Sequence, residues 1–471
     1  MGSENKPCSS TIDSKDDSIF SESLFANLDI SKELKDALDK HGFIKMTKVQ
    51  EQTILPLLAK KDVVASARTG SGKTLAFLVP AIQLLLEASF STSMGTGALI
   101  IAPTRELAIQ IFVVAKTLTE NMDLSLGLVI GGAPKHSEAE HLSRGVNLLV
   151  ATPGRLLDHM LNTSGFVYSN LKALIIDEAD RCLEVGFERE MHAIMNRLPE
   201  ERQTLLFSAT QTQKMDDLIA ISVKDPLYVG VDDEREVSTA TNLTQGYIVC
   251  PSDTRFLLLY AFLKRNLKNK VIVFMCSCKS VQFYGDLLNH INIPVMTLHG
   301  RQKQSKRTST FNSFMEADAG VLICTDVAAR GLDIPNVDWI IQYDPTDDPK
   351  EYIHRVGRAC RGGSAREAKA LMFLLPEELE FLNYLKAAKV PVNEFEFPKN
   401  KVPNIQAHLE KTVGSIFSLT SAATVAFKSY IAAYSTHSMK KVFNVQKLDL
   451  KKVATSFCLT VPPRVTIGPN K

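Results

Sequence analysis

The chain has 471 residues, which is long for a single domain, so we expect two or three domains. Hydrophobic residues make up 45% of the sequence and charged residues 23%, which is typical of a globular protein with ample material for an apolar core. The formal net charge of +2 is too small to indicate binding to nucleic acid or to an anionic membrane. Any such function has to rest on local sites.

The N-terminal composition and the cysteines indicate an intracellular protein without a membrane span. No uninterrupted apolar run reaches the ~18 residues that a spanning helix needs, so we expect no membrane association. Ser, Asp and Lys dominate the start of the chain, and residues 1–23 are predicted to be a disordered tail. Among eight cysteines only Cys276 and Cys278 lie close together. We expect them on one face of a half-buried strand rather than at a metal, because a metal site needs more ligands.

Short apolar, β-branched runs recur through the first half of the chain, each followed by a polar loop. Unbroken apolar runs predict parallel strands that are buried on both faces of a sheet. These runs lie at residues 61–67, 97–104, 146–153, 171–180 and 202–210. Helical spacing over residues 74–88 and 105–118 places helices between strands. We therefore predict an open α/β sheet with helices on both sides.

This alternation breaks at residues 231–242, a charged, Thr-rich segment that we interpret as an interdomain linker. A second series of strands is predicted at residues 269–277, 293–300, 319–331, 337–344 and 368–376. From about residue 376 the sequence is mainly helical. The predicted division is a tail at 1–23, an α/β domain at 24–230, the linker at 231–242, a second α/β domain at 243–395 and an extension at 396–471.

The segment ASARTGSGKTLAF, residues 65–77, indicates a phosphate site. A strand leads into a glycine-rich turn, and backbone N–H groups at the start of the following helix can face a phosphate. Lys73 can reach the β- and γ-phosphates, and the Thr74 hydroxyl can bind Mg²⁺. We interpret the segment as a nucleotide-binding loop rather than a plain turn, with Ala67 where the usual pattern begins with glycine. Its residues are Ala67, Arg68, Thr69, Gly70, Ser71, Gly72, Lys73 and Thr74.

Three carboxylates, Asp177, Glu178 and Asp180, follow an apolar run. A nucleotide-binding loop needs a second strand that ends in an acid, and Asp177 has the position to hold Mg²⁺, partly through water. Glu178 is placed to orient or deprotonate an attacking water. The alternative is a solvated acidic turn. That alternative accounts for Asp180 but not for an acid pair directly after buried residues.

Eleven motifs in a fixed order resemble those of the DEAD-box ATP-dependent RNA helicases. In the first half they are GFIKMTKVQ (42–50), ARTGSGKT (67–74), PTRELA (103–108), GG (131–132), TPGR (152–155), DEAD (177–180) and SAT (208–210). In the second half they are VIVFMCS (271–277), QSKR (304–307), TDVAARGLD (325–333) and HRVGRACR (354–361). The resemblance covers residues 24–390. It implies two tandem RecA-like domains, ATP and Mg²⁺ as cofactors, and a monomeric RNA-stimulated ATPase that unwinds RNA locally.

The resemblance also implies roles at the ATP site. Gln50 is implied to read the adenine edge, Phe43 to stack on the base, and Phe25 to be the isolated upstream aromatic of the same motif. Lys48 stands where the family usually has Pro. Asp333 is implied to contact the ribose.

Hydrolysis is implied to use groups from both domains. Lys73, Asp177 and Glu178 act with Arg358 and Arg361, the arginine fingers that stabilise charge on the transferring phosphoryl group. Their spacing of three places both arginines on one face if the segment is helical. The residues implied to couple hydrolysis to domain movement are Asp180, Ser208, Thr210 and His354.

RNA contacts are implied in both domains, through hydroxyl, guanidinium and glycine N–H groups that suit phosphate and sugar oxygens. We therefore expect little sequence preference. The preference for RNA over DNA rests on the resemblance alone. The implied contact residues are Pro103, Thr104, Arg105, Gly132, Thr152, Pro153, Gly154, Arg155, Phe274, Gln304, Arg307 and Thr325.

Residues 426–465 resemble the extension of the nucleolar, ribosome-biogenesis branch of the family. This implies pre-ribosomal RNA as substrate, pre-ribosomal proteins as partners and a nucleolar location. The alternative is a helical appendage whose Phe427, Tyr430 and Tyr434 simply pack on the second domain. Two other functions stay open: an ATP-gated RNA clamp or scaffold in which unwinding is incidental, and a DNA helicase or translocase on the same fold.

Overall fold

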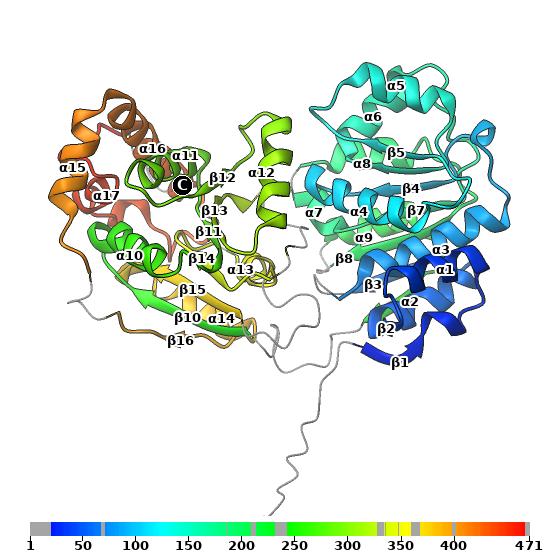
Figure 1. Ribbon diagram of the computed structural model, residues 1–471, viewed down its shortest axis with the longest axis horizontal. Coiled ribbons are helices and arrows are strands. Elements are labelled where there is room, and N and C mark those ends of the chain that lie inside the picture. The colour runs from blue at the N-terminus through cyan, green and yellow to red at the C-terminus, as the bar shows by residue number, and fades with distance from the viewer. Residues whose placement is uncertain are drawn as a thin grey trace, which may run out of the picture.

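Two α/β domains lie side by side, and the C-terminal helices cover the side of the second domain away from the first (Figure 1). This computed structural model describes residues 20–66, 71–184, 186–208, 213–230, 243–326, 334, 336–346, 348–358, 368–397 and 402–466.

The first domain is built on a seven-stranded parallel sheet in the order β5-β6-β4-β7-β8-β3-β9, among the residues described. Its strands are β3 Val63–Ser66, β4 Ala98–Ile101, β5 Leu126–Val129, β6 Leu148–Ala151, β7 Ala173–Ile176, β8 Gln203–Ser208 and β9 Leu227–Gly230. Its helices are α1 Lys32–Lys40, α2 Lys48–Leu58, α3 Lys73–Glu87, α4 Arg105–Leu118, α5 Lys135–Arg144, α6 Pro153–Asn162, α7 Ala179–Glu184, α8 Glu188–Met195 and α9 Gln213–Ser222. All five predicted strands are confirmed; β5 and β9 were not predicted.

The strands read as unbroken apolar runs because both faces of the sheet are covered. Along β4, Ile100 belongs to one hydrophobic core and Ile101 to another on the opposite face. Along β3, Val63 and Val64 divide in the same way. Successive side chains of a β-strand point to opposite faces of the sheet, so they alternate between the two cores. Helices therefore had to cover both sides, as the apolar runs predicted.

A two-stranded antiparallel ribbon precedes the sheet, with β1 at Phe20–Leu24 and β2 at Lys45–Thr47. Residues 20–23, which we expected to belong to a disordered tail, therefore lie in a strand. The side-chain hydroxyl of Ser21 donates to the carbonyl of Met46. The ordered part of the first domain includes at least residue 20.

The second domain repeats the parallel sheet with seven strands in the order β12-β13-β11-β14-β15-β10-β16, again among the described residues. The strands are β10 Leu243–Val249, β11 Lys270–Phe274, β12 Met296–Leu298, β13 Gly320–Cys324, β14 Trp339–Gln342, β15 Ala368–Leu374 and β16 Asn393–Glu394. The helices are α10 Ser252–Arg265, α11 Cys278–His290, α12 Gln304–Glu316, α13 Pro349–Val356 and α14 Phe381–Ala387. The five predicted strands are confirmed, and β10 and β16 were missed. The predicted linker, residues 231–242, lies outside the described residues.

The prediction for Cys276 and Cys278 is wrong. Strand β11 is buried along its whole length and ends at Phe274. Cys276 follows the strand, and Cys278 is the first residue of α11, whose N-terminus is capped by the Ser277 hydroxyl. A serine that accepts a backbone N–H at this position favours a helix start over a continued strand.

The C-terminal extension shares one hydrophobic core with the second domain. Its helices are α15 Gln406–Ser415, α16 Phe417–Thr436 and α17 Leu450–Ser456. Helix α16 packs on α11, and α17 packs on α10. The Phe457 ring stacks on Tyr284 of α11, with ring centroids 5.2 Å apart. The extension is thus an integral layer of the second domain.

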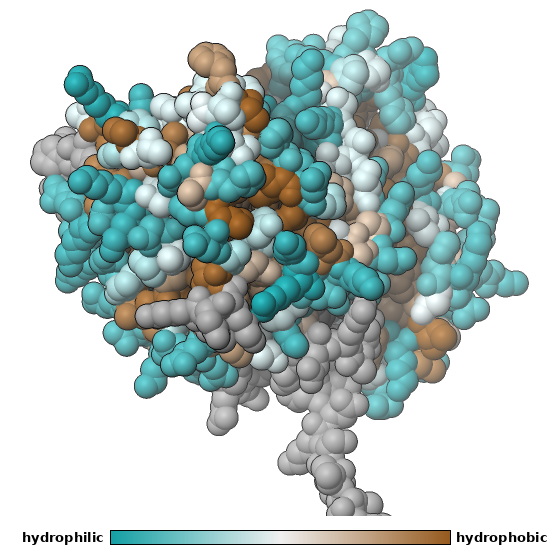
Figure 2. All heavy atoms as spheres, turned by 60° about the vertical axis from the view of Figure 1, so that its left-hand side comes forward, coloured by the Kyte–Doolittle hydropathy of each residue, from teal (hydrophilic) through white to brown (hydrophobic). Residues whose placement is uncertain are grey.

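No single helix in the described part of the chain is long and apolar enough to cross a membrane, although α15 and α16 together pass by length and composition with a bend of 110° between them. In α16, Phe427 and Ile431 are buried against the second domain. The face of the molecule in Figure 2 is largely hydrophilic, with smaller apolar areas between the polar groups.

Candidate functional site

The loops that carry the predicted chemistry of the first domain leave neighbouring strands. Strand β3 leads toward α3, β7 ends directly before Asp177, and β8 lies between these two strands. Parallel strands present their carboxyl ends at one edge of a sheet, which is where ligands bind in such folds. Ser208, the last residue of β8, lies opposite Ser66 of β3. The Lys73 ammonium lies over the Phe207 ring at the same edge.

Helix α3 begins at Lys73, and its N-cap is Gly72 with φ +90°. A Cβ atom at Gly72 would lie 2.5 Å from Gln50 Nε2, so the position requires glycine both for its conformation and for its space. Ser71 and Thr74 are half-buried on either side. The rest of the predicted phosphate loop, Ala67, Arg68, Thr69 and Gly70, lies outside the described residues.

Gln50 ties helix α2 to this loop. Thr47 and Gln50 form a capping box: the Thr47 N–H donates to Gln50 Oε1 at 2.7 Å, and the Gln50 N–H donates to Thr47 Oγ1 at 3.3 Å. The remaining amide group, Gln50 Nε2, donates to the Gly72 carbonyl at 3.0 Å. Lys48 occupies the first helical position, where the family's Pro is also tolerated, so the departure leaves the turn intact.

The two aromatic residues predicted with Gln50 differ in exposure. Phe43 is half-buried against the first core and keeps part of its ring accessible. Phe25 is only 3% exposed and belongs to that core. The predicted nucleotide contact of the Phe25 side chain is therefore not supported, because its burial leaves no ring face for a base.

The three acids after β7 are buried, and this excludes the solvated turn. Asp177, Glu178 and Asp180 are 5%, 8% and 7% exposed. The Glu178 N–H donates to Asp177 Oδ1 at 3.0 Å. Glu178 itself has φ +48°, a left-handed conformation that is unusual for a residue with a side chain. Strain of this kind is typical of functional positions.

Burial raises the pKa of Asp177 to about 6, with Lys73 opposing this shift and Glu178 adding to it. A buried carboxylate is stable only beside a cation or several donors. The Asp177 carboxylate and the Thr74 hydroxyl are hard oxygen donors of the kind that Mg²⁺ prefers. The residues present therefore fit a magnesium ion, which would also relieve the burial of negative charge at Asp177.

The second domain brings helix α13 to its own sheet edge. Arg355, on this helix, makes two bonds to the Asp326 carboxylate, from Nε at 2.6 Å and from Nη2 at 2.8 Å. Helix α13 ends at Val356, so Arg358 lies in the turn beyond the helix. The condition for placing Arg358 and Arg361 on one helical face, that their segment is helical, is therefore not met at Arg358. Arg358 is fully buried, and its Nε donates to the His354 carbonyl at 2.9 Å. Arg361, Asp333 and Thr210 lie outside the described residues.

The two domains contact each other between α4 and α12. Arg307 Nη2 lies 2.6 Å from Glu106 Oε1, and these two residues are 4% and 2% exposed. Beside them Arg105 Nη1 donates to Gln304 Oε1 at 2.9 Å, and Gln304 Nε2 donates to Glu106 Oε1 at 3.3 Å. Arg307 and Gln304, which we expected to contact RNA, contact the first domain in this structure.

Several other predicted RNA contacts have buried side chains. Phe274 ends the buried strand β11 with no exposed surface, and the Arg355 guanidinium lies 5.1 Å from its ring centroid. The Phe274 ring has no surface for RNA in this structure, so the contact of this residue stays a prediction. The remaining buried ones are Pro103, Thr152, Pro153 and Thr325. Those with exposed or half-exposed surface are Thr104, Arg105, Gly132, Gly154 and Arg155.

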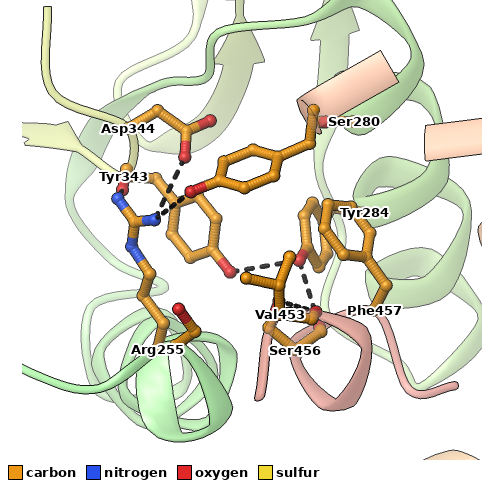
Figure 3. A pocket seen from close by; sticks show the side chains of 10 residues that line it. Arg255, Ser280, Tyr284, Tyr343, Asp344, Val453, Ser456 and Phe457 are labelled. Atoms are coloured by element: carbon orange, nitrogen blue, oxygen red, sulfur yellow. Dashed lines mark hydrogen bonds and ion pairs between the residues drawn. The ribbon is translucent and has the colours of Figure 1, made fainter. Parts of the chain in front are cut away.

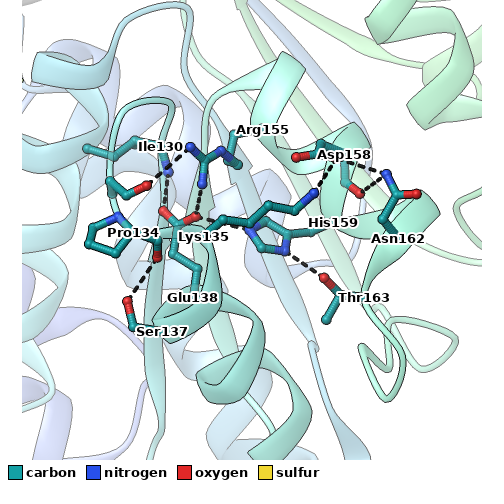
Figure 4. Close-up of polar contacts among 11 residues, drawn as sticks. Ile130, Pro134, Lys135, Ser137, Glu138, Arg155, Asp158, His159, Asn162 and Thr163 are labelled. Atoms are coloured by element: carbon teal, nitrogen blue, oxygen red, sulfur yellow. Dashed lines mark hydrogen bonds and ion pairs between the residues drawn. The ribbon is translucent and has the colours of Figure 1, made fainter.

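Glu138 organises the loops that carry the exposed candidates of the first domain (Figure 4). Its Oε1 accepts the Ile130 N–H at 3.0 Å, and its Oε2 accepts Arg155 Nη1 at 2.6 Å. The same Oε2 lies 3.0 Å from Nε2 of His159, which is fully buried. Arg155 Nη2 also donates to the Ala133 carbonyl. One carboxylate thus joins the loop at 130–133 to the start of α6.

Family models match this chain in three places. The DEAD/DEAH box helicase model matches residues 47–218, and the helicase conserved C-terminal domain model matches residues 254–363. The C-terminal extension of ATP-dependent rRNA helicases similar to SPB4 matches residues 418–465. These matches cover strands β3 to β8 of the first sheet, β11 to β14 of the second, and helices α16, from its second residue, and α17.

Curated relatives are similar over almost the whole chain. The probable ATP-dependent RNA helicase ddx18 of Dictyostelium discoideum is 60% identical over 95% of this chain and 74% of its own length. The chain belongs to the DEAD-box family of ATP-dependent RNA helicases. The ATP-dependent RNA helicase HAS1 of Saccharomyces cerevisiae is 58% identical over 94% of this helicase and 88% of the relative. This helicase is accordingly an RNA-dependent ATPase of the HAS1 and ddx18 type, and the resemblance predicted from its motifs is confirmed.

Solved structures share the fold of the helicase. Mss116p bound to single-stranded RNA and AMP-PNP matches with a TM-score of 0.81 and 28% identity, over 92% of this chain and 89% of that chain. S. cerevisiae Dbp5 bound to RNA and ADP BeF3 matches with a TM-score of 0.71 and 25% identity, over 83% and 99%. The predicted pair of tandem RecA-like domains is confirmed.

Sequence reasoning missed Glu106, Glu138 and His159 of the helicase. Glu106 lies inside the quoted PTRELA motif, so its position was a signal that went unused. Glu138 and His159 lie outside the quoted motifs, and the two contacting side chains are 21 residues apart. Nothing in one sequence indicates that pairing.

The burial of Asp177 predicts that its removal stabilises the ligand-free helicase. Its folded pKa of about 6 lies above the ordinary 3.8, so this side chain lowers the stability progressively as pH rises from about 3.8 to about 6, and the full cost is present above that range. At pH 7.5, without nucleotide or Mg²⁺, Asp177→Asn should raise the free energy of unfolding of the first domain by roughly 1–3 kcal/mol. The gain should shrink toward pH 4, where Asp177 is protonated when folded. Urea denaturation measures this.

Asp36→Asn, on the exposed face of α1, is the matched control, with an expected change below about 0.5 kcal/mol. A destabilised Asp177→Asn protein at pH 7.5, or a gain that does not depend on pH, would contradict the electrostatic account of this site.

Proposed function

We propose that this helicase uses Mg²⁺ and ATP to unwind or remodel short RNA segments in pre-ribosomal particles, acting as a monomer in the nucleolus. The observation that supports the proposal is the contact between the two domains at the buried Glu106–Arg307 pair, beside the candidate residues Arg105 and Gln304. Each domain holds groups suited to phosphate or RNA. The proposed division of the chain places the first domain before residue 231, the linker at 231–242, the second domain at 243–395 and the extension at 396–471.

On the nucleotide side, Lys73 binds the phosphates, with Thr74 and Asp177 as ligands of Mg²⁺. The ion would screen phosphate charge during transfer. Glu178 orients and deprotonates the attacking water, and its buried position holds that oxygen away from bulk solvent. Gln50 reads adenine by exchanging its present partners, and Phe43 supplies a half-exposed ring. Ala67, Arg68, Thr69, Gly70, Ser71 and Gly72 complete the phosphate loop, and Asp333 binds the ribose.

Arg358 and Arg361 stabilise charge on the phosphoryl group from the second domain. Asp180, Ser208, Thr210 and His354 transmit the loss of that phosphate to the domain contact. The likeness to Mss116p bound to RNA and AMP-PNP extends over both domains, which supports an arrangement close to a ligand-bound one. ATP bridging both halves favours this arrangement, and hydrolysis removes the bridge.

RNA is held by groups that suit its backbone. Thr104, Arg105, Gly132, Gly154 and Arg155 lie at the carboxyl edge of the first sheet and keep exposed surface. Guanidinium and glycine N–H groups bind phosphate oxygens and give little sequence preference. A short backbone footprint suits local strand separation better than long translocation.

Ribosomal RNA as the substrate is supported by residues 418–465, which match the extension of an rRNA helicase. Pre-ribosomal proteins as partners and a nucleolar location follow from such a substrate. The second candidate is an ATP-gated RNA clamp, favoured by the same buried domain contact, because a closed state with bound ATP could persist on RNA.

The first expected outcome concerns Glu178. The purified protein should hydrolyse ATP faster with single-stranded RNA than without it. Glu178→Gln should lower turnover by about 10²–10⁴-fold while RNA and ATP stay bound, because only the water-activating step is lost. Glu188→Gln, a half-buried residue of α8 whose carboxylate pairs with Lys214 at the surface, should behave as wild type.

Steady-state phosphate release and RNA filter binding measure the two effects. Undiminished turnover in Glu178→Gln would show that another group activates water. Duplex unwinding in the same preparation separates a helicase from a clamp, since a clamp would hold RNA without repeated strand release.

A further expected outcome tests Glu138. Glu138→Gln keeps the shape of the side chain but replaces one acceptor oxygen by a donor, so Arg155, Ile130 and His159 can no longer all be satisfied. Affinity for single-stranded RNA should fall about three- to tenfold, a loss of roughly 1 kcal/mol. ATP affinity without RNA should not change.

The matched control is Glu140→Gln, on the exposed side of the same helix, whose carboxylate pairs only with Arg144 in the contacts described. Fluorescence anisotropy with labelled RNA and a non-hydrolysable ATP analogue measures both. Equal RNA affinity for the two variants and wild type would rule out an RNA-positioning role for Glu138.

A further inference from the structure

A small buried cavity lies where the C-terminal extension meets the second domain (Figure 3). Arg255 of α10 and Asp344, which follows β14, line it from the domain, and Tyr430 of α16 and Ser456 of α17 line it from the extension. Its volume of about 10 Å³ holds no more than one water-sized group. The cavity is therefore too small to bind a ligand, but the charged side chain of Arg255 forms part of its wall.

Arg255 is a buried cation with partners on both sides of this boundary. It is 3% exposed. Its Nη1 lies 3.4 Å from Asp344 Oδ1 and 3.4 Å from the Tyr430 hydroxyl. Its Nη2 donates to the Tyr343 carbonyl, and its guanidinium lies 4.9 Å from the Tyr343 ring centroid. A buried guanidinium is tolerated only with such a set of partners, so its position is closely defined.

Asp344 connects Arg255 to helix α13. Its Oδ2 accepts the Cys276 N–H at 2.9 Å, which joins it to the end of β11. Its backbone carbonyl accepts Arg355 Nη1 at 2.9 Å. Arg255 and Arg355 therefore bind opposite sides of one residue. Arg355 in turn holds Asp326, and Arg358 follows in the same segment.

The extension contributes two polar groups to this boundary, the Tyr430 hydroxyl and the Ser456 carbonyl. Tyr343 donates to the Tyr284 hydroxyl at 3.1 Å, and Tyr284 donates to the Ser456 carbonyl at 3.0 Å. Two series of polar contacts thus connect the extension with residues 343–344, one through Arg255 and one through Tyr284.

We propose that Arg255 is a positioning residue through which the docked extension holds α13, and with it Arg358, in place for ATP hydrolysis. The proposal rests on the role of Arg358 in the proposed function. It assigns the extension a part in the turnover of the enzyme beyond any contact of its own with RNA.

The decisive experiment uses the full chain with Tyr430→Phe, which removes one hydroxyl and keeps the ring packed. RNA-saturated kcat should fall about two- to fivefold, since one hydrogen bond to the guanidinium is lost. The KM for ATP and the affinity for RNA should change by less than about twofold, because neither ligand touches Tyr430. Unchanged kcat in this variant overturns the proposal.

Arg255→Met and Arg265→Met form a matched pair on helix α10, buried and exposed respectively. Arg255→Met should lower kcat about tenfold or more at temperatures well below its melting transition, and Arg255→Lys should restore part of it. Arg265→Met should match wild type. In the Arg255→Met background the effect of Tyr430→Phe should vanish.

A purely structural role would lower the melting temperature of Arg255→Met while leaving kcat unchanged, and that result also overturns the proposal. If Arg255→Met does not fold, Tyr430→Phe decides alone. Absence of RNA-stimulated turnover in the wild-type protein is a failure of the proposed function, and it is distinguishable because it precedes any comparison of variants.

Discussion

Alternate residues along the strands are buried in cores on opposite faces of each sheet, and this constraint governs where chemistry can occur. In the first domain Ile100 and Ile101 point into different cores, and β11 of the second domain is buried throughout. Polar groups can then gather only where strands end. Asp177, Ser208 and the start of α3 occupy that edge in one domain, and Thr325 and Asp344 occupy it in the other. The candidate residues of each domain therefore gather at the strand ends of its own sheet.

Several charged side chains of this protein are buried, and they differ in how well their charge is compensated. Burial disfavours the ionised form of Asp177 in the absence of ligand. Glu138 and Arg255, in contrast, each have several hydrogen-bonding or charged partners. The contrast separates two uses of burial. A matched charge fixes the geometry of the loops around it, and an under-compensated charge favours a cation that arrives with the substrate. Proteins accept lower stability at such sites because function needs them.

Much of this could be predicted from the sequence, because the apolar runs and the ordered motifs report local properties. The strands were found since a strand buried on both faces has few polar residues, and β16 was missed since it has only two residues. Phe25 and Phe274 were predicted as ligand contacts from their motifs, and a motif does not reveal that both rings are buried in the cores. Arg255 and Glu138 were missed because their partners are distant in sequence and their surroundings carry no pattern.

The Glu106–Arg307 pair affects the alignment of the two domains more than the strength of their contact. The free energy needed to remove both charges from water is about as large as the free energy gained from their attraction. A buried ion pair of this kind therefore contributes little to the net stability of the domain contact. Its geometry nevertheless admits one alignment of α4 against α12 and disfavours sliding. The pair therefore defines how α4 and α12 align while adding little to the stability of the domain contact.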